Sequence, residues 1–143
     1  MAYTDLTRGP YSVTGDRRRM DVDAVHGFLT RSFWARGISR DLVAKSIAHS
    51  LCFGLFDGQA QIGFARVVTD LSTYAYLCDV YVLEQYRGQG LGKWMIEFVM
   101  AHPDLQGLRR FQLVTRDAHG LYRRFGFETP ADPGRHLEIF SDF

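Results

Sequence analysis

The stretch that decides the fold reads CDVYVLEQYRGQGLGKWMIEFVM and spans residues 78–100. Its first part is rich in β-branched and aromatic residues, which predicts a strand that ends near Val82. A polar turn and a glycine-dense loop follow, and apolar residues then recur from Leu91 to Val99 at the spacing of one helix face. We therefore expect a strand, a loop and a helix whose apolar side packs against a sheet.

The glycine loop ends where the helix begins, and unpaired backbone N–H groups with a partial positive charge favour an anion there. Gly88, Gly90 and Gly92 let a ligand approach the backbone closely. A Walker A loop would need Ser or Thr after Lys93, where Trp94 stands, and a dinucleotide fingerprint would need a third glycine at position 93. The loop alone predicts either an anion site or a tight strand-to-helix connection without a ligand.

Two motifs together resemble one family. Arg87-x-x-Gly90-x-Gly92 resembles the Gln/Arg-x-x-Gly-x-Gly/Ala loop of the GNAT N-acetyltransferase superfamily, which also lies between a strand and an amphipathic helix. Residues 115–127, TRDAHGLYRRFGF, resemble the family's Asn-x-x-Ala-x-x-Leu-Tyr-x-x-x-Gly-Phe segment, with threonine in place of the frequent asparagine. The resemblance closely covers residues 78–127 and implies an N-acetyltransferase that uses acetyl-coenzyme A.

The bulk properties agree with a soluble globular protein. A length of 143 residues suits one domain over residues 1–143, and 46% hydrophobic with 23% charged residues is the usual composition of such a domain. A net charge of +1 gives no indication of nucleic-acid binding, and no apolar run is long enough to span a membrane. Cys52 and Cys78 lack the spacing of a zinc site, so we expect buried reduced thiols and no metal. The N-terminus lacks a signal-peptide pattern, so we expect a cytoplasmic protein, either a monomer or a homodimer.

The periodicity along the chain predicts an α/β (α+β) fold with the element order β-α-α-β-β-β-α-β-α-β, which is similar to the GNAT fold. We expect a mixed, mostly antiparallel sheet of about six to seven strands flanked by about four helices. The expected strands are residues 10–14, 51–56, 61–68, 74–82 and 108–115, with weaker ones near Glu128 and over 136–140. The expected helices start at Asp21, Ser39, Leu91 and Ala118; the first ends near residue 33, the third near residue 101 and the fourth at residue 125.

The resemblance also implies roles for particular residues. The strand before the loop would pair with the pantetheine arm of the coenzyme, and the loop would hold its pyrophosphate. The coenzyme-binding residues implied are Val80, Tyr81, Val82, Arg87, Gly88, Gln89, Gly90, Leu91, Gly92, Lys93, Thr115, Asp117 and Tyr122. Tyr122 matches the family's general acid, which protonates the departing thiolate. Helix patterning alone also allows it to be a core tyrosine.

Fewer residues indicate how the acceptor amine would be bound. Asp79 is a candidate catalytic and substrate-binding residue, although an ordinary aspartate is a poor base and would rather attract an ammonium group. Phe33, Trp34, Tyr74 and Tyr76 supply aromatic surface for an acceptor, unless they belong to the core. A small-molecule amine is favoured over a protein N-terminus or a lysine, because no acidic run suits a basic peptide. The alternative from another class is a non-catalytic acyl-coenzyme A sensor or partner-binding module.

Overall fold

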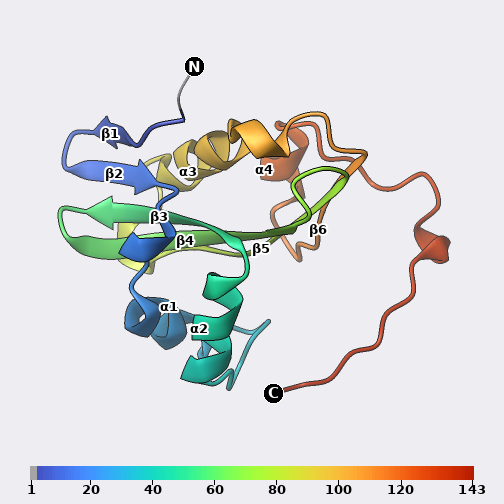
Figure 1. Cartoon of the computed structure of the whole chain (residues 1–143), viewed down its shortest axis with the longest axis horizontal. Helices are drawn as coiled ribbons and strands as arrows, with labels where there is room; N and C mark the ends of the chain where they lie inside the picture. Colours follow the sequence, from blue (N-terminus) through green and yellow to red (C-terminus); the bar gives the residue numbers. More distant parts are fainter. Residues whose placement is uncertain (1–2) are drawn as a thin grey trace.

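The computed structural model describes residues 3–143. Six strands form one mixed sheet in the order in which they occur in the chain (Figure 1). They are β1 (Leu6–Arg8), β2 (Tyr11–Thr14), β3 (Leu51–Asp57), β4 (Ala60–Thr69), β5 (Tyr74–Val82) and β6 (Arg110–Leu113). The first five strands are antiparallel neighbours, and β6 runs parallel to β5, as a strand-helix-strand crossover requires. The mixed, mostly antiparallel sheet is therefore confirmed.

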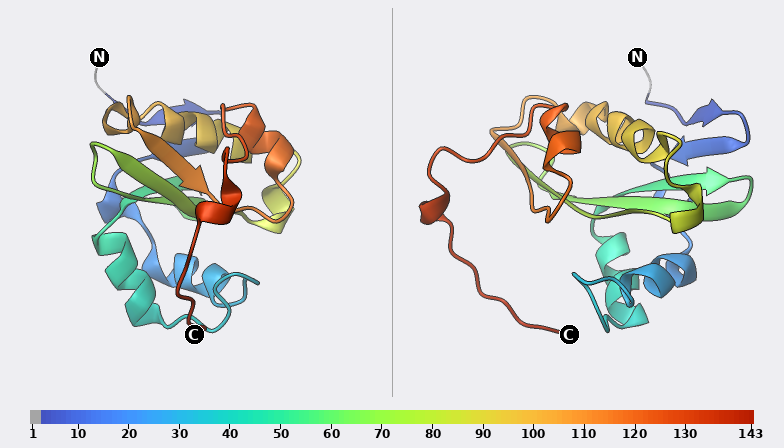
Figure 2. Two further views of the ribbon diagram at one scale, coloured as in Figure 1. Left: turned by 90° about the vertical axis from the view of Figure 1, so that its right-hand side faces the viewer. Right: turned by 180° about the vertical axis from the view of Figure 1, so that it is seen from behind.

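Helices cover both faces of this sheet, as the views from the side and from behind show (Figure 2). Helices α1 (Val22–Leu29) and α2 (Arg40–Ala48) lie on one face, and α3 (Leu91–Met100) and α4 (His119–Arg123) lie on the other. Each face has its own apolar cluster, so the protein is a three-layer structure with a sheet between two cores. No helix among residues 3–143 has the length and apolar character needed to cross a bilayer.

The helix starts follow the sequence signals. Asp21 caps α1, because its carboxylate accepts a hydrogen bond from the backbone N–H of Ala24. Ser39 caps α2 in the same way through the N–H of Leu42. The apolar spacing of this helix predicts that Leu42 faces inward, but Leu42 is exposed, so that prediction is wrong. The buried side chains of α2 are those of Val43 and Ile47.

The first helix ends earlier than its apolar spacing predicts. The carbonyl of Leu29 accepts a hydrogen bond from the hydroxyl of Ser32, and the N–H of Gly37 donates to the carbonyl of Thr30. These bonds satisfy the carbonyl groups at the helix end and turn the chain into a loop. Phe33 therefore lies in an exposed loop and not on a helix face.

Two elements after α3 are shorter than expected. The sixth strand covers only four of the eight residues predicted for 108–115. Asp117 does not cap α4, because the hydroxyl of Thr115 accepts the hydrogen bond from the N–H of Ala118 and no side chain caps the helix itself. The loop between β6 and α4 is consequently longer and carries more exposed residues than the sequence predicted.

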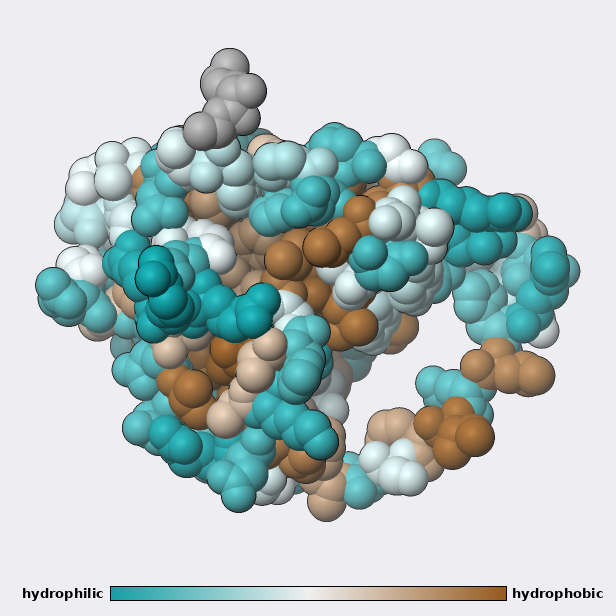
Figure 3. Space-filling model, in the orientation of Figure 1, coloured by the Kyte–Doolittle hydropathy of each residue, from teal (hydrophilic) through white to brown (hydrophobic). Residues whose placement is uncertain are grey.

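The C-terminal segment is also different from the prediction. The weak strands near Glu128 and over residues 136–140 are absent, and residues 131–143 are all exposed in an extended tail that leaves the sheet (Figures 1 and 3). Alternation of apolar residues makes a strand only where a neighbouring strand offers backbone partners, and none of the described strands does so here.

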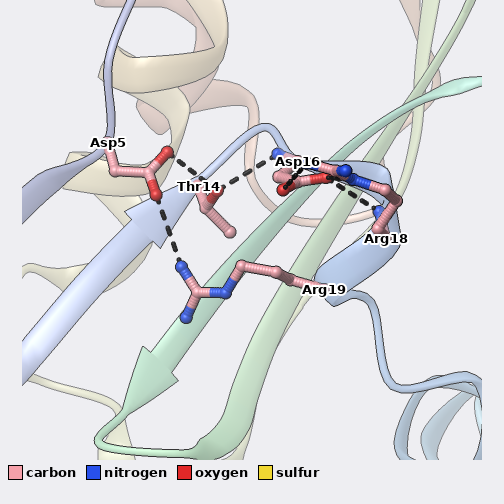
Figure 4. Close-up of polar contacts among 5 residues, drawn as sticks. All are labelled: Asp5, Thr14, Asp16, Arg18 and Arg19. Atoms are coloured by element: carbon pink, nitrogen blue, oxygen red, sulfur yellow. Dashed lines mark hydrogen bonds and ion pairs between the residues drawn. The ribbon is translucent and has the colours of Figure 1, made fainter.

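A polar cluster joins the first two strands to the turn that follows them (Figure 4). The buried hydroxyl of Thr14 donates to the carboxylate of Asp5 at 2.8 Å and accepts from the N–H of Asp16. Arg19 forms an ion pair with Asp5, and Arg18 forms one with Asp16. Arg17 instead donates to the carbonyl of Ala48, so all three arginines of this exposed basic run have partners within the chain.

Candidate functional site

The central strand β5 has an unpaired edge over its second half. Its parallel ladder with β6 joins residues 74–77 to 110–113 and ends at Leu77, whereas β5 continues to Val82. On its other side β5 remains paired with β4 up to Val82, with an irregular register near Asp79, which has a positive φ of 55°. The free edge beyond Leu77 therefore offers backbone groups to an extended ligand.

The glycine loop leads from this strand end to α3. Gly88 and Gly90 adopt left-handed conformations with φ of 81° and 78°, which other residues rarely adopt. A Cβ atom at either position would meet nothing within 4 Å, so the backbone faces open space. No side chain caps α3, and its first helical hydrogen bond runs from the N–H of Trp94 to Gly90. The N–H groups of the first turn are thus available to an anion.

The loop is also held in place by side chains. The Nε of Arg87 donates to the carbonyl of Val82 at 2.8 Å, which ties the loop to the end of β5. The amide of Gln89 bonds with Tyr86 and Tyr11 and does not line the cavity described below. Lys93 lies 4.0 Å from Glu97 and is likewise outside the lining, so the cavity contains neither of these two predicted residues.

A cavity of about 650 Å³ lies beside the free edge of β5 and the start of α3. Three parts of the chain that are far apart in the sequence line it, and the middle part contributes both the strand end and the loop. They supply Phe28, Ser32, Phe33 and Trp34; Val80, Tyr81 and Val82; Tyr86, Arg87, Gly88, Gly90, Leu91 and Gly92; and Arg116, Asp117, Ala118, Leu121 and Tyr122. Most of the predicted coenzyme residues therefore meet in one place. Thr115 is absent from the lining, since its hydroxyl bonds to the backbone before α4.

Tyr122 lines this cavity. Only 8% of the residue is exposed, and its phenol has no hydrogen-bond partner in residues 3–143. Since the described part of the chain contains no fully buried polar side-chain atom without a partner, the hydroxyl retains access to solvent. Burial raises the pKa of the Tyr122 phenol above its ordinary value, so the group remains a proton donor at neutral pH.

Asp79 occupies a different place from the one its predicted role requires. Its carboxylate accepts one hydrogen bond from Arg66 Nε at 2.9 Å and another from Trp34 Nε1 at 3.0 Å. Arg66 also donates to the hydroxyl of Ser50, and the carboxylate is not part of the cavity lining. The structure thus engages both oxygens of Asp79 within the protein and uses one of them to orient Trp34.

We expect Asp79→Ala to destabilise the protein by roughly 2–4 kcal/mol, because it leaves the charge of Arg66 largely buried and uncompensated. The side chains of Arg66 and Asp79 are 18% and 11% exposed. The matched control is Asp23→Ala, which removes the exposed ion pair with Arg40 and should cost much less, because ion pairs in solvent contribute little to stability. Urea unfolding of both variants measures the difference, and equal losses would contradict a structural role for the Asp79 pair.

The aromatic acceptor residues divide into two groups. Phe33 and Trp34 line the cavity from the loop after α1, and their rings are 5.1 Å apart. Tyr74 and Tyr76 lie at the other end of β5 and outside the lining, where the hydroxyl of Tyr74 donates to Gln112.

Two cavity residues lack any separate signal in the sequence. Ser32 follows the end of α1, and Arg116 lies within the second motif at a position that the motif leaves open. The guanidinium of Arg116 lies 3.7 Å from the centroid of the Phe33 ring. Only the folded chain shows this contact, because Phe33 follows α1 and Arg116 follows β6, far apart in the sequence.

The buried thiol of Cys78 is not activated as a nucleophile. Burial raises the pKa of the Cys78 thiol to about 12, so the nucleophilic thiolate is scarce at neutral pH. Residues 3–143 contain no group of three or more His, Cys, Asp or Glu side chains arranged to bind a metal ion. The arrangement instead fits an anion at the start of α3 and an extended arm along β5.

Comparison with known proteins gives consistent results. A family model described as "Acetyltransferase (GNAT) domain" matches residues 48–129. A protein of Gibberella zeae named "Putative acetyltransferase" is 32% identical over 139 residues, which covers 81% of this chain and 77% of the relative.

Solved structures show the same similarity. A GNAT-family protein of Xanthomonas campestris pv. campestris, described as a "putative acetyltransferase", is 48% identical with a TM-score of 0.89 and covers 92% of this chain and 93% of that one. A Clostridium acetobutylicum protein described as a "predicted acetyltransferase with acetyl-CoA" has a TM-score of 0.65 at 15% identity, with 91% and 94% of the two chains covered. The second similarity shows the fold alone.

Proposed function

Since the chain belongs to the GNAT family of acetyltransferases, we propose that it transfers an acetyl group from acetyl-coenzyme A to the primary amine of a small molecule. The observation that carries this proposal is the free edge of β5 beside the open start of α3. An extended pantetheine arm has amide groups that can pair with such an edge as an added strand does. The Clostridium protein of the same fold, described with acetyl-coenzyme A, supports this choice of donor.

The residues present fit the coenzyme at both ends. The N–H groups of Leu91, Gly92 and Lys93 precede the first helical hydrogen bond of α3 and suit a pyrophosphate. The open space at Gly88 and Gly90 allows the phosphate to approach the backbone. Arg87 adds a positive charge at the same place, since only its Nε is occupied by the carbonyl of Val82.

The chemistry then needs few side chains. The neutral amine nitrogen attacks the thioester carbonyl, the carbon–sulfur bond breaks, and the coenzyme leaves as a thiolate. A backbone N–H near Val82 would stabilise the negative oxygen that develops on the carbonyl. Tyr122 would give its proton to the sulfur, and the proton lost by the new amide nitrogen would pass to solvent. Direct transfer in a ternary complex is consistent with the protonated state of Cys78.

A small acceptor fits the cavity better than an extended peptide. The space of about 650 Å³ has to hold the reactive end of the coenzyme as well as the acceptor. Asp117 is the only acidic residue among the described residues that line it, so an acidic groove for a lysine-rich peptide is not supported.

The test is release of free thiol from acetyl-coenzyme A across a panel of amines, read with a thiol-reactive dye. We expect thiol release that depends on the amine and equals the amount of N-acetylated product found by mass spectrometry. The control omits the amine and measures hydrolysis. Tight binding of acetyl-coenzyme A without turnover of any amine would contradict this proposal and favour the non-catalytic acyl-coenzyme A sensor.

A further inference from the structure

The acceptor side of the cavity lacks the free carboxylate that an ammonium group would need. Asp79 was the candidate, but Arg66 and Trp34 occupy its two oxygens. Among the described residues that line the cavity, Asp117, next to Arg116, is the only acidic one. This side of the cavity therefore does not select an acceptor by attracting its ammonium group to a carboxylate.

Positive charge is available there instead. Arg116 is exposed, lines the cavity and forms no ion pair or hydrogen bond with any residue in 3–143. Its contact with the Phe33 ring holds the guanidinium plane by a cation–π interaction and leaves its N–H donors free. A guanidinium in this state is prepared to bind a carboxylate or a phosphate through two parallel hydrogen bonds.

A second hollow of about 290 Å³ adjoins the cavity and strengthens this pattern. The two spaces share Phe28, Ser32 and Arg87, and the smaller one is also lined by Arg31 and Glu84. Only the Nε of Arg31 is occupied, since it donates to the carbonyl of Gly27 at 2.7 Å. Arg31 therefore lines a hollow that adjoins the cavity, and Arg116 lines the cavity itself.

We propose that the acceptor is a small amine that also carries an acidic group, a carboxylate or a phosphate, and that Arg116 binds this group. The inference rests on the proposed acetyltransferase function and names the substrate class of that same site. The body of the acceptor would lie against Trp34, which Asp79 holds by its hydrogen bond. Arg116 would thereby determine specificity while taking no part in the transfer of the acetyl group.

Two matched pairs of amines test this inference and separate the two acidic groups. Phenylalanine is compared with phenethylamine, which lacks the carboxylate, and glucosamine 6-phosphate is compared with glucosamine. Thiol release gives kcat and KM for the wild type, for Arg116→Gln and for Arg124→Gln. Arg124 is an equally exposed arginine that lies outside the cavity lining and serves as the control.

We expect kcat/KM to be at least about tenfold higher for the acidic member of one pair, mainly through KM. Arg116→Gln should remove that preference, leave kcat/KM of the uncharged member within about twofold, and leave the dissociation constant of coenzyme A unchanged by calorimetry. Arg124→Gln should behave as the wild type. The pair that shows the preference identifies the acidic group.

Each of three results would overturn the inference, and each would lead to a different conclusion. Equal or better turnover of the uncharged member in both pairs would exclude an acidic acceptor while leaving the acetyltransferase function intact. Weaker coenzyme binding by Arg116→Gln would assign Arg116 to the coenzyme. Absence of turnover with these four amines and with the wider panel would contradict the proposed function itself and this inference with it.

Discussion

Replacing Gly90 with glutamate is expected to weaken coenzyme A binding at least about 100-fold, because it places a negative charge beside the pyrophosphate at the start of α3. Gly90 has φ of 78° and faces open space, so the new side chain would enter the volume that the phosphate needs. Isothermal calorimetry with coenzyme A measures the loss. The neutral variant Gly90→Asn tolerates this backbone conformation and should bind more tightly than the glutamate variant.

The control for backbone strain is Gly107→Glu. Gly107 also has a positive φ, of 70°, and open space around its Cβ position, but it lies between α3 and β6 outside the cavity lining. Both glutamate variants should therefore lose similar stability, roughly 1–2 kcal/mol each. Only the Gly90 variant should lose coenzyme binding. Retained coenzyme affinity in Gly90→Glu, or an equal loss of coenzyme affinity in both variants, would refute the assignment of the phosphate site.

Tyr122→Phe is expected to lower kcat about 100-fold while the dissociation constant of coenzyme A changes little. The substitution removes one hydroxyl that has no protein partner, so it should leave the melting temperature nearly unchanged. Single-turnover measurements separate the transfer step from product release. A variant that turns over as fast as the wild type would show that Tyr122 is only a core tyrosine.

The pH dependence provides a second readout for Tyr122. The neutral phenol is the active form, and burial raises its pKa above the ordinary value of about 10. Loss of kcat through deprotonation of this group should therefore begin only above about pH 10 in the wild type and be absent from Tyr122→Phe. Tyr74→Phe is the control, because its hydroxyl donates to Gln112 at the other end of β5 and lies outside the cavity lining.

The sequence predicted the coenzyme side of the candidate site better than the acceptor side. The residues of the loop from Arg87 to Gly92 are adjacent in the chain, and their roles depend mainly on backbone conformation. Local glycine spacing therefore contained most of the information, and the cavity gathers these residues as expected, apart from the side chain of Gln89. The acceptor side instead depends on contacts between loops, which local patterns do not encode.

Tertiary pairing also explains the errors at the two ends of the chain. The apolar alternation over residues 136–140 is typical of a strand, but the described part of the sheet gives it no partner, and these residues remain exposed. The three residues of β1 were not predicted, since their position depends on pairing with β2 and on the bonds of Asp5.

By itself the sequence determined the element order from β2 to α4, the helix caps at Asp21 and Ser39, and the glycine loop at the start of α3. These features arise from periodicity, side-chain capping and backbone freedom over a few consecutive residues. Only the tertiary structure decided which groups Asp79 and Arg116 contact. Ion pairing with Arg66 engages Asp79 within the protein, and the contact with the Phe33 ring holds Arg116 in the cavity lining, because the partners come from segments that folding alone brings together.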